Sequence, residues 1–343
     1  MKNINLSIDG GGTGIRILAF DEELKLLGRG FSGPVNATFE NEEKVGGNIS
    51  EALKILFDPL PKNLKIHKIF KTLVGSSASF GKIFMGFAKE RGIVTQDADI
   101  CEIREGHSHI LAASLGEEGG VALSGTGSGA IYCSRGKIIH LGGCGVPVGD
   151  EGSGAWIGLQ AMSAVMKELN GWGEETALTK KLYEYLQLDQ FGSITGALYK
   201  KGTNQQHLFA GFCRAVAECE RSGDKVAREI IYRAGKNMGL QMIAALKRAE
   251  SANMLNTQKK APEIYASGGA WKSTPYMFLA MKGTIQEKYP GAICKYGLFD
   301  PVMAGVIKFV FETTGKNTIS HKTQHHLQKE FDSYLFKFEG AKS

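Results

Sequence analysis

The feature that most constrains the fold is a glycine-rich turn between two apolar segments, and this arrangement occurs twice. In "NINLSIDGGGTGIRILAF" (residues 3–20), apolar residues alternate with polar ones on both sides of the glycines. A period of two predicts strands, so the glycines join two strands of a hairpin. "GGVALSGTGSGAIYCSRGKIIHLGG" (residues 119–143) repeats the pattern around a second glycine turn. The repetition predicts an internal duplication at the level of architecture.

The glycines of the first turn suit the binding of an anion. Because Gly10, Gly11, Gly12 and Gly14 have no Cβ, we expect the turn to adopt positive φ angles and to admit a ligand close to the main chain. Backbone N–H groups there would form an anion cradle, and Asp9 would hold a water of a metal ion. The alternative is an ordinary hairpin with Asp9 as a turn residue. No Walker loop or dinucleotide fingerprint is present, because neither Gly-Lys-Ser/Thr nor a helix follows.

The pattern of the remaining chain alternates strands with helices. Helical spacing in "EEKVGGNISEALKILFD" (42–58) precedes a buried strand in "HKIFKTLVGSS" (67–77). We predict an α/β protein with a mixed sheet in each half, an N-terminal domain at residues 1–114 and a helix-rich C-terminal domain at residues 115–343. A ligand would be clamped in a cleft between them. The polar tail after about residue 315 has no predicted role.

The composition excludes several classes of function. The formal charge of +6 is spread along 343 residues without a basic run interleaved with aromatics, so we expect no nucleic-acid partner. No apolar span of about 18 residues and no signal peptide is recognisable, so we expect no membrane partner and a cytoplasmic location. The cysteines show no CxxC spacing, and we expect reduced thiols at all six positions: Cys101, Cys133, Cys144, Cys213, Cys219 and Cys294.

Four stretches, in order, resemble one family: "DGGGTG", "SGTGS", "GDEGSGAWIGLQA" and "FAGFCR", followed by "GGAWKS". Over roughly residues 4–310 the chain resembles the BadF/BadG/BcrA/BcrD ATPase family of the acetate kinase, sugar kinase, Hsp70 and actin superfamily. Within that family it is most similar to the N-acetylglucosamine kinases. The resemblance implies two ribonuclease-H-like (actin-like ATPase) domains with a ligand cleft between them. It also implies a kinase that uses ATP and Mg²⁺ to convert an amino sugar, N-acetylglucosamine first, to its 6-phosphate.

The resemblance assigns three turns to the nucleotide. The first two turns would hold the β- and γ-phosphates. The third turn, which contains Gly268 and Gly269 of "GGAWKS", would approach the adenosine, and Asp9 would reach Mg²⁺ through water. Alignment and charge stabilisation of this kind are most of what phosphoryl transfer requires. The nucleotide-binding residues implied are Gly11, Gly12, Thr13, Gly125, Thr126, Gly127, Gly268 and Gly269.

On the sugar side, the resemblance implies that Asn36, Ser76, Gly143 and Asp150 bind the substrate. Two of these assignments have a structural alternative. Asp150 is also placed to cap a helix that begins near Ser153, where carboxylates are favoured. Asn36 is also a common turn residue.

Two departures from the family pattern alter the expected site. Gly14 stands where the family usually has Lys or Arg after the first turn. Arg16 would point to the same face of the following strand and can supply that charge. Cys144 stands where the family has Trp, and the small thiol leaves room for a bulkier sugar substituent or for a different sugar.

A third departure concerns the catalytic base. In "CEIREGHSHI", Glu105 occupies the position of the family's catalytic Asp. A carboxylate remains able to accept the proton of an attacking hydroxyl, but its oxygens move by about an ångström. The rival hypothesis is a catalytically weak or inactive sugar- and ATP-binding protein. His107 and His109 form an HxH pair, which without a third ligand is weaker evidence for a metal than for a helix start.

Two other classes of protein are less well supported. The family includes ATPase activators that hold an iron–sulfur cluster at a dimer interface through cysteines. Here Cys213 and Cys219 lie six residues apart in a helical stretch, and nothing pairs with Cys144. A sugar-responsive repressor would need a helix-turn-helix segment, for which the eight residues before Asp9 leave no room. The sequence does not settle which amino sugar binds or whether a homodimer forms.

Overall fold

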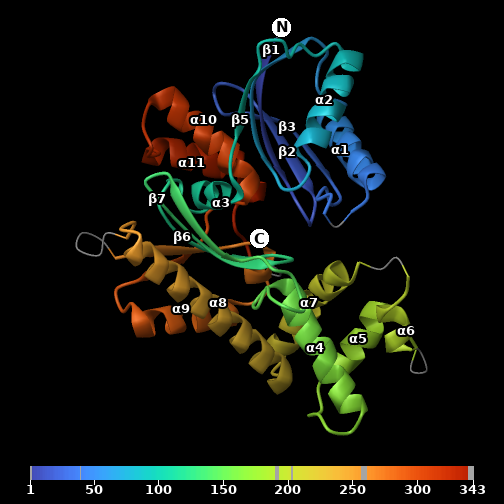
Figure 1. Cartoon of the computed structure of the whole chain (residues 1–343). Helices are drawn as coiled ribbons and strands as arrows, with labels where there is room; N and C mark the ends of the chain where they lie inside the picture. Colours follow the sequence, from blue (N-terminus) through green and yellow to red (C-terminus); the bar gives the residue numbers. More distant parts are fainter. Residues whose placement is uncertain (1, 39, 190–192, 202–203, 256–260, 339–343) are drawn as a thin grey trace. The chain divides into compact units, whose positions relative to one another are not determined.

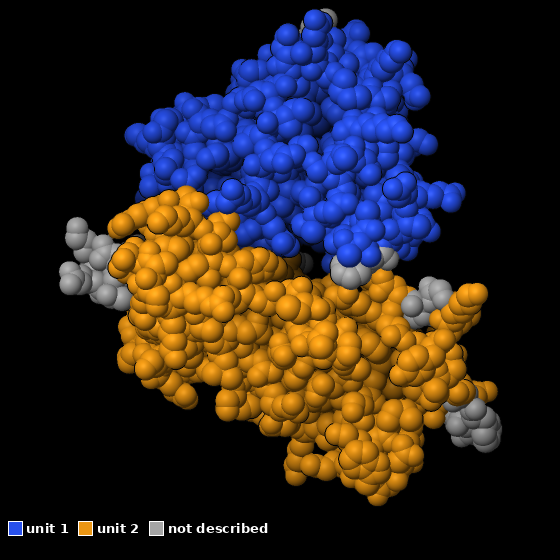
Figure 2. All heavy atoms as spheres, viewed as in Figure 1, with its two compact units in different colours: residues 1–117, 297–335 blue, residues 118–296, 336–343 orange. Residues whose placement is uncertain are grey.

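The chain forms two compact units, which Figure 2 shows in different colours. Unit 1 comprises residues 1–117 and 297–335, and unit 2 comprises residues 118–296 and 336–343. The predicted division at residues 114–115 differs from this one, because residues 297–335 pack with unit 1. The computed structural model describes residues 2–38, 40–189, 193–201, 204–255 and 261–338.

Unit 1 is built on a five-stranded mixed sheet with the order β3-β2-β1-β4-β5. β1 pairs antiparallel with β2, which pairs antiparallel with β3, while β4 runs parallel to both β1 and β5. The strands are β1 (Lys2–Gly10), β2 (Ile15–Phe20), β3 (Leu26–Ser32), β4 (Leu64–Leu73) and β5 (Asp99–Glu102).

Helices cover both faces of this sheet (Figure 1). One face buries alternate residues of β1, such as Ile4, Leu6 and Ile8, beneath α1 and α2. On the other, Phe20 and Phe70 pack edge-to-face with Phe309 of α10. The helical elements of the unit are α1 (Glu42–Phe57), α2 (Ser77–Arg91), α3 (Glu105–Ser114), η2 (Pro301–Met303), α10 (Ala304–Thr314), α11 (His321–Glu330) and η3 (Asp332–Tyr334).

A buried hydroxyl explains why the C-terminal segment belongs to unit 1. Ser7 of β1 donates a hydrogen bond from Oγ to the carbonyl of Val302 at 2.6 Å and accepts one from the N–H of Gly305 at 3.0 Å. A Cβ on Gly305 would lie 2.3 Å from Ser7 Oγ, so only glycine allows this approach. The start of α10 therefore closes over the central strand of the sheet.

Unit 2 repeats the sheet of unit 1. Its strand order is β10-β9-β6-β7-β8, with β6–β7 and β7–β8 antiparallel and β6–β9 and β9–β10 parallel. The order and directions match those of unit 1 when β6 is placed on β1, which is the duplication that the repeated glycine turn predicts. The strands are β6 (Gly119–Ser124), β7 (Ser128–Ser134), β8 (Lys137–Gly142), β9 (Glu263–Ser267) and β10 (Ile293–Tyr296).

Unit 2 carries the longer helices, which cross at glycines. A Cβ on Gly158 would lie 1.9 Å from the carbonyl oxygen of Phe209, and one on Gly235 would lie 2.1 Å from that of Met277. These glycines bring α4 against α7 and α8 against α9. The helical elements are α4 (Gly154–Leu169), α5 (Leu178–Leu186), α6 (Ile194–Leu198), α7 (Gln205–Arg221), α8 (Lys225–Ser251), η1 (Gly269–Lys272) and α9 (Pro275–Lys288).

Over the residues described, none of these helices combines the length and the apolar character needed to span a bilayer.

Candidate active site

The first glycine turn closes the β1–β2 hairpin and ties it to its neighbours. The N–H of Gly11 donates to the carbonyl of Gly14 at 3.1 Å. The carbonyls of Gly10 and Gly11 accept hydrogen bonds from Val74 and Val35 at 2.9 and 3.0 Å. The turn is thus fixed on both sides by the segments that follow β4 and β3.

Close packing, and not positive φ, requires glycine at two positions of this turn, Gly10 and Gly14. A Cβ on Gly10 would lie 2.8 Å from Leu73 Cδ2, and a Cβ on Gly14 would lie 2.7 Å from the carbonyl oxygen of Ser32. None of Gly10, Gly11, Gly12 and Gly14 has a positive φ, so the prediction of positive φ angles was wrong. Nothing lies within 4 Å of a Cβ placed on Gly12, which leaves the backbone at the tip bare.

Asp9, the penultimate residue of β1, lies beside one positive and two negative side chains. Burial raises the pKa of Asp9 from 3.8 to about 6; the guanidinium of Arg16 opposes the rise and the carboxylates of Glu105 and Asp300 add to it. Asp9 and Arg16 are cross-strand partners, so both side chains lie on one face of the sheet. Arg16 Nη1 lies 3.9 Å from Asp300 Oδ2. Arg16 therefore places a positive charge beside the turn, as the sequence predicts.

Asp300 is a member of this cluster that sequence reasoning missed. It lies almost 300 residues from Asp9 in the chain, immediately before Pro301 and the start of η2. The only local signal was an acid followed by Pro at a helix start, which is typical of ordinary helix caps. Its proximity to Asp9 depends on the return of the C-terminal segment to unit 1.

Glu105 is the first residue of α3, and its N-terminal neighbour Arg104 is the N-cap. Its side chain lines a cavity of about 200 Å³ at the ends of β4 and β5. Lys71, Thr72 and Ser77 line the same cavity, and Ser77 bonds both Lys71 and Glu102 at 2.9 and 3.0 Å. The carboxylate that the sequence places at the family's catalytic position thus borders a small polar cavity of unit 1.

The two histidines after Glu105 belong to α3. His109 is buried, and desolvation lowers the pKa of His107. Within the described part of the chain, no three His, Cys, Asp or Glu side chains form a group able to hold a metal ion. Both histidines lie in the first half of α3, as the helix-start interpretation of the HxH pair predicts.

Asn36 lies against Gly75, the residue before Ser76, in unit 1. Asn36 Oδ1 accepts a hydrogen bond from the N–H of Thr38 at 2.9 Å, which is the turn role considered for it. A Cβ on Gly75 (φ +74°) would lie 2.5 Å from the same oxygen. Ser76 is 3% exposed, and its Oγ has no hydrogen-bond partner although it precedes α2. A buried hydroxyl without a partner is unusual in a folded protein.

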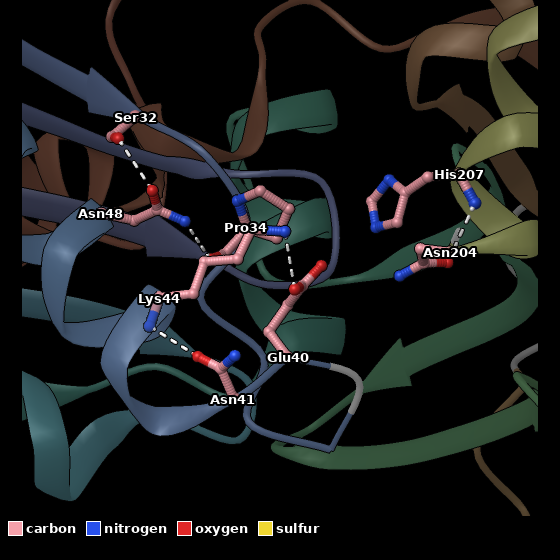
Figure 3. Close-up of polar contacts among 8 residues, drawn as sticks. All are labelled: Ser32, Pro34, Glu40, Asn41, Lys44, Asn48, Asn204 and His207. Atoms are coloured by element: carbon pink, nitrogen blue, oxygen red, sulfur yellow. Dashed lines mark hydrogen bonds and ion pairs between the residues drawn. The ribbon is translucent and has the colours of Figure 1, made fainter. Parts of the chain in front are cut away.

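Asn48 of α1 fixes the loop that carries Asn36 (Figure 3). Its Nδ2 donates to the carbonyl of Pro34 at 2.6 Å, and its Oδ1 lies 3.4 Å from the hydroxyl of Ser32. Asn41 caps the same helix, accepting a hydrogen bond from the N–H of Lys44 at 2.8 Å. The middle of α1 is therefore held against the end of β3 through Asn48, next to the first glycine turn.

The second glycine turn is joined to the start of α4. Its backbone and the two flanking serines bond the segment of residues 151–155, so that the turn and the helix N-terminus form one rigid element. No heavy atom lies within 4 Å of a Cβ placed on Gly125, so this tip is also bare. The bonds are Ser124 Oγ to Gly152 O (2.7 Å), Ser128 Oγ to Glu151 O (3.1 Å), Gly154 N to Gly125 O (2.8 Å) and Ala155 N to Thr126 O (3.3 Å).

Asp150 braces the second turn. Its carboxylate accepts backbone hydrogen bonds from Ser128, Gly143 and Gly145, while desolvation, the largest influence, raises its pKa. Asp150 is 3% exposed, and its Oδ1 has no partner. Ser153 caps α4, so the alternative role of Asp150 as the helix cap is wrong.

The loop between β8 and Asp150 has an unusual backbone. Gly142, Gly143 and Gly145 all have positive φ, and Asp150 itself has φ +59°. Gly143 donates to the carbonyl of Ser128 at 2.9 Å, which draws this loop against the second turn. Cys144, at the position of the family's Trp, is exposed.

The third glycine turn packs directly on the second. Gly268 has φ +112°, and a Cβ there would lie 2.3 Å from the carbonyl oxygen of Ser124. Gly269, next along the chain, has nothing within 4 Å of its Cβ position. The indole N–H of Trp271 donates to the carbonyl of Ala122 at 2.9 Å, anchoring η1 to β6.

Comparison with known protein sequences gives a consistent family. The sequence profile of the BadF/BadG/BcrA/BcrD ATPase family matches residues 6–307. An N-acetylmuramic acid/N-acetylglucosamine kinase of Clostridium acetobutylicum is 25% identical over 303 residues, covering 83% of this chain and 91% of that protein. An N-acetyl-D-glucosamine kinase of Dictyostelium discoideum is 26% identical over 325 residues, covering 89% of this chain and 97% of that protein.

Solved structures agree on the fold. A candidate N-acetylglucosamine kinase from Chromobacterium violaceum superposes with a TM-score of 0.63 at 20% identity, covering 90% of this chain and 99% of that one. A ROK family glucokinase from Streptomyces griseus, solved with glucose and AMPPNP, gives a TM-score of 0.52 at 14% identity, covering 89% and 97%. The chain therefore has the actin-like ATPase fold of the sugar kinases. With the profile spanning both glycine turns and both sheets, the chain belongs to the BadF/BadG/BcrA/BcrD ATPase family.

Proposed function

We propose that this chain is an ATP-dependent kinase of an amino sugar, with N-acetylglucosamine as the first candidate and its 6-phosphate as the product. Membership of an ATPase family implies the use of ATP, and the names of the relatives point to amino sugars. The observation that carries the proposal is the bare backbone at the tips of the glycine turns. Gly12, Gly125 and Gly269 each leave open the space that a side chain would fill.

On the nucleotide side, backbone N–H groups of the first two turns bind the phosphates of ATP, and the third turn approaches adenosine. Asp9 holds Mg²⁺ through water, and the neighbouring carboxylates of Glu105 and Asp300 favour a cation there. When bound, Mg²⁺ neutralises charge on the transferring phosphoryl group. The residues proposed are Gly11, Gly12, Thr13, Gly125, Thr126, Gly127, Gly268 and Gly269.

On the sugar side, Asn36, Ser76, Gly143 and Asp150 bind the acceptor. Two of them retain unused buried polar atoms, namely Ser76 Oγ and Asp150 Oδ1, which a sugar hydroxyl would satisfy. An acceptor without the matching hydroxyl would leave these atoms unpaired, which gives the site its selectivity.

Glu105 is the proposed general base. The sugar hydroxyl oxygen forms a bond to the γ-phosphorus as the bond from that phosphorus to the β–γ bridging oxygen breaks. ADP leaves with the electron pair, and the hydroxyl proton passes to the Glu105 carboxylate. The guanidinium of Arg16 lies near enough to Asp9 to lower its pKa. Arg16 supplies the positive charge that the family usually has at the position of Gly14.

The second candidate is a catalytically weak or inactive protein that binds sugar and ATP. The specific observation in its favour is Glu105, whose longer side chain replaces the family's Asp. No specific observation favours the cluster-bearing activator: Cys133, Cys213 and Cys219 are buried free cysteines.

The test is a panel of amino sugars screened by thermal shift with and without Mg-ATP, followed by an ADP-release assay. A ligand that binds only the folded protein raises its melting temperature by mass action. The kinase proposal requires stabilisation by both ligands and sugar-dependent ADP release. Stabilisation without release supports the binding protein, and no stabilisation by ATP contradicts both candidates.

A further inference from the structure

The C-terminal end of α7 forms hydrogen bonds with the segment that follows the third glycine turn. Glu220 is a buried carboxylate, 7% exposed, whose Oε2 accepts a hydrogen bond from the hydroxyl of Thr274 at 2.8 Å. The guanidinium of its neighbour Arg221 donates to the carbonyl of Ser273. Glu220 and Arg221 of α7 thus bond Thr274 and Ser273. These two residues form the C-terminal end of the segment 268–274, which begins with Gly268 and Gly269.

This segment is fixed at both ends and at Trp271, and its backbone is bare at Gly269. At one end, Gly268 lies so close to Ser124 that no side chain fits between them. At the other end, Thr274 is 1% exposed and also caps α9, accepting a hydrogen bond from the N–H of Tyr276 at 3.2 Å. The bonds that anchor Thr274 therefore fix the C-terminal end of the segment, while Trp271 and Gly268 fix the residues on either side of Gly269.

A carboxylate is an unusual choice for such an anchor. Removing its charge from water is unfavourable, and only well-placed donors offset that loss. In return, a charged acceptor forms a stronger and more directional bond than a neutral one. This strength matters where a backbone segment must hold one position against a ligand.

We propose that Glu220 is a positioning residue for the nucleotide: through Thr274 it sets the place of Gly268–Gly269 against the adenosine. The inference rests on the proposed function, since it takes the third turn to be the adenosine side of an ATP site. Glu220 itself touches no ligand. Its removal weakens contacts to adenosine and leaves contacts to the phosphates, which belong to the other two turns.

The test compares three probes: ATP, AMP and inorganic tripolyphosphate, each titrated calorimetrically. Loss of one buried hydrogen bond predicts that Glu220→Ala binds ATP and AMP about five- to tenfold more weakly. Binding of tripolyphosphate stays unchanged. Glu220→Gln retains an acceptor for Thr274 and stays within about twofold of wild type.

A matched control removes a carboxylate that makes the same bond elsewhere in unit 2. Asp224 Oδ2 accepts from the hydroxyl of Thr176 at 2.8 Å, at the start of α8. Asp224→Ala lowers the melting temperature but leaves all three affinities unchanged. If Glu220→Ala does not fold, Thr274→Val removes the donor instead and must give the same pattern of affinities.

Several outcomes overturn the inference. The first is that Glu220→Ala weakens the binding of tripolyphosphate as much as the binding of AMP. The second is that a folded Glu220→Ala variant binds AMP with wild-type affinity. The third is that the Asp224→Ala control shows the same changes in affinity as Glu220→Ala. A wild-type protein that binds neither ATP nor AMP overturns the proposed function together with this inference. Intact ATP binding that is abolished by Thr126→Arg, yet unaffected by Glu220→Ala, overturns the inference alone.

Discussion

If Asp9 holds the metal's water as we propose, it must be ionised to do so, and the affinity for Mg-ATP should fall steeply below neutral pH. Burial raises the pKa of Asp9 to about 6. About nine-tenths of the carboxyls are then ionised at pH 7 and about one-tenth at pH 5. We expect the dissociation constant to rise about tenfold between these values, with a midpoint near pH 6. Titration calorimetry with Mg-ATP from pH 5 to 8 measures this directly.

Two substitutions test whether Asp9 causes the pH dependence of Mg-ATP binding. Asp9→Asn should weaken binding at pH 7 and abolish the dependence on pH. Because the charge of Arg16 lowers the pKa of Asp9, Arg16→Gln should move the midpoint above pH 6. Arg91 pairs with Asp58 on the surface of unit 1, so Arg91→Gln is a matched control that should leave the midpoint in place.

The raised pKa of Asp9 also makes the free energy of unfolding depend on pH. The folded pKa lies above the ordinary value of 3.8, so the folded protein binds the proton more tightly than the unfolded chain. The stabilisation is fully present below about pH 3.8 and is lost as the pH rises through about 6. Asp9→Asn should therefore raise the free energy of unfolding at pH 7, by at most about 3 kcal/mol, and leave it unchanged near pH 3.

The reasoning is refuted if Asp9→Asn keeps the wild-type pH profile of Mg-ATP binding. A midpoint of wild-type Mg-ATP binding below pH 5 would also refute the reasoning, because Asp9 would then not be desolvated as the structure has it.

Three further predictions concern other parts of the molecule. Glu105→Gln should lower kcat by a factor on the order of 10²–10⁴ with little change in sugar affinity; unaltered turnover removes Glu105 from the mechanism. Glu105→Asp should also lower kcat if the site fits the longer side chain, whereas a higher rate marks the wild type as a weakened kinase. Thr126→Arg should abolish stabilisation by ATP in a thermal-shift assay while the protein stays folded. Gly30→Ala places a Cβ 2.1 Å from the carbonyl oxygen of Ala52, so it should lower the free energy of unfolding by about 1–3 kcal/mol in a denaturant titration.

Features with a local cause could be predicted from the sequence. The alternation around the two glycine turns predicted both hairpins, because side chains of a strand alternate between its faces. The prediction that Arg16 lies on the face where it can replace the basic residue missing at Gly14 used the same geometry, whereas its pairing with Asp9 is seen only in the structure. The conformation of the first turn did not follow, because glycine permits positive φ without requiring it. There the missing Cβ makes room for Leu73 and Ser32, which lie far along the chain.

Features that depend on long-range packing could not be predicted. The segment of residues 297–335 looked polar and weakly periodic in part, yet Phe331 and Tyr334 are buried in the core of unit 1. The contribution of Asp300 to the surroundings of Asp9 depends on this return. Likewise, the support that Glu220 gives to Thr274 joins two helices 54 residues apart in the chain. No local pattern carries such information.

The hydrogen bonds of Ser7 have a consequence for synthesis on the ribosome. Its partners at Val302 and Gly305 emerge only after about 300 residues have been made. Until then, one face of the first sheet lacks α10, and Phe20 and Phe70 have no Phe309 to cover them. Most of unit 2, whose main segment is continuous, emerges before that point. We expect the second unit to complete its core first, although it is made later, and the nascent first unit to need protection from aggregation while it waits.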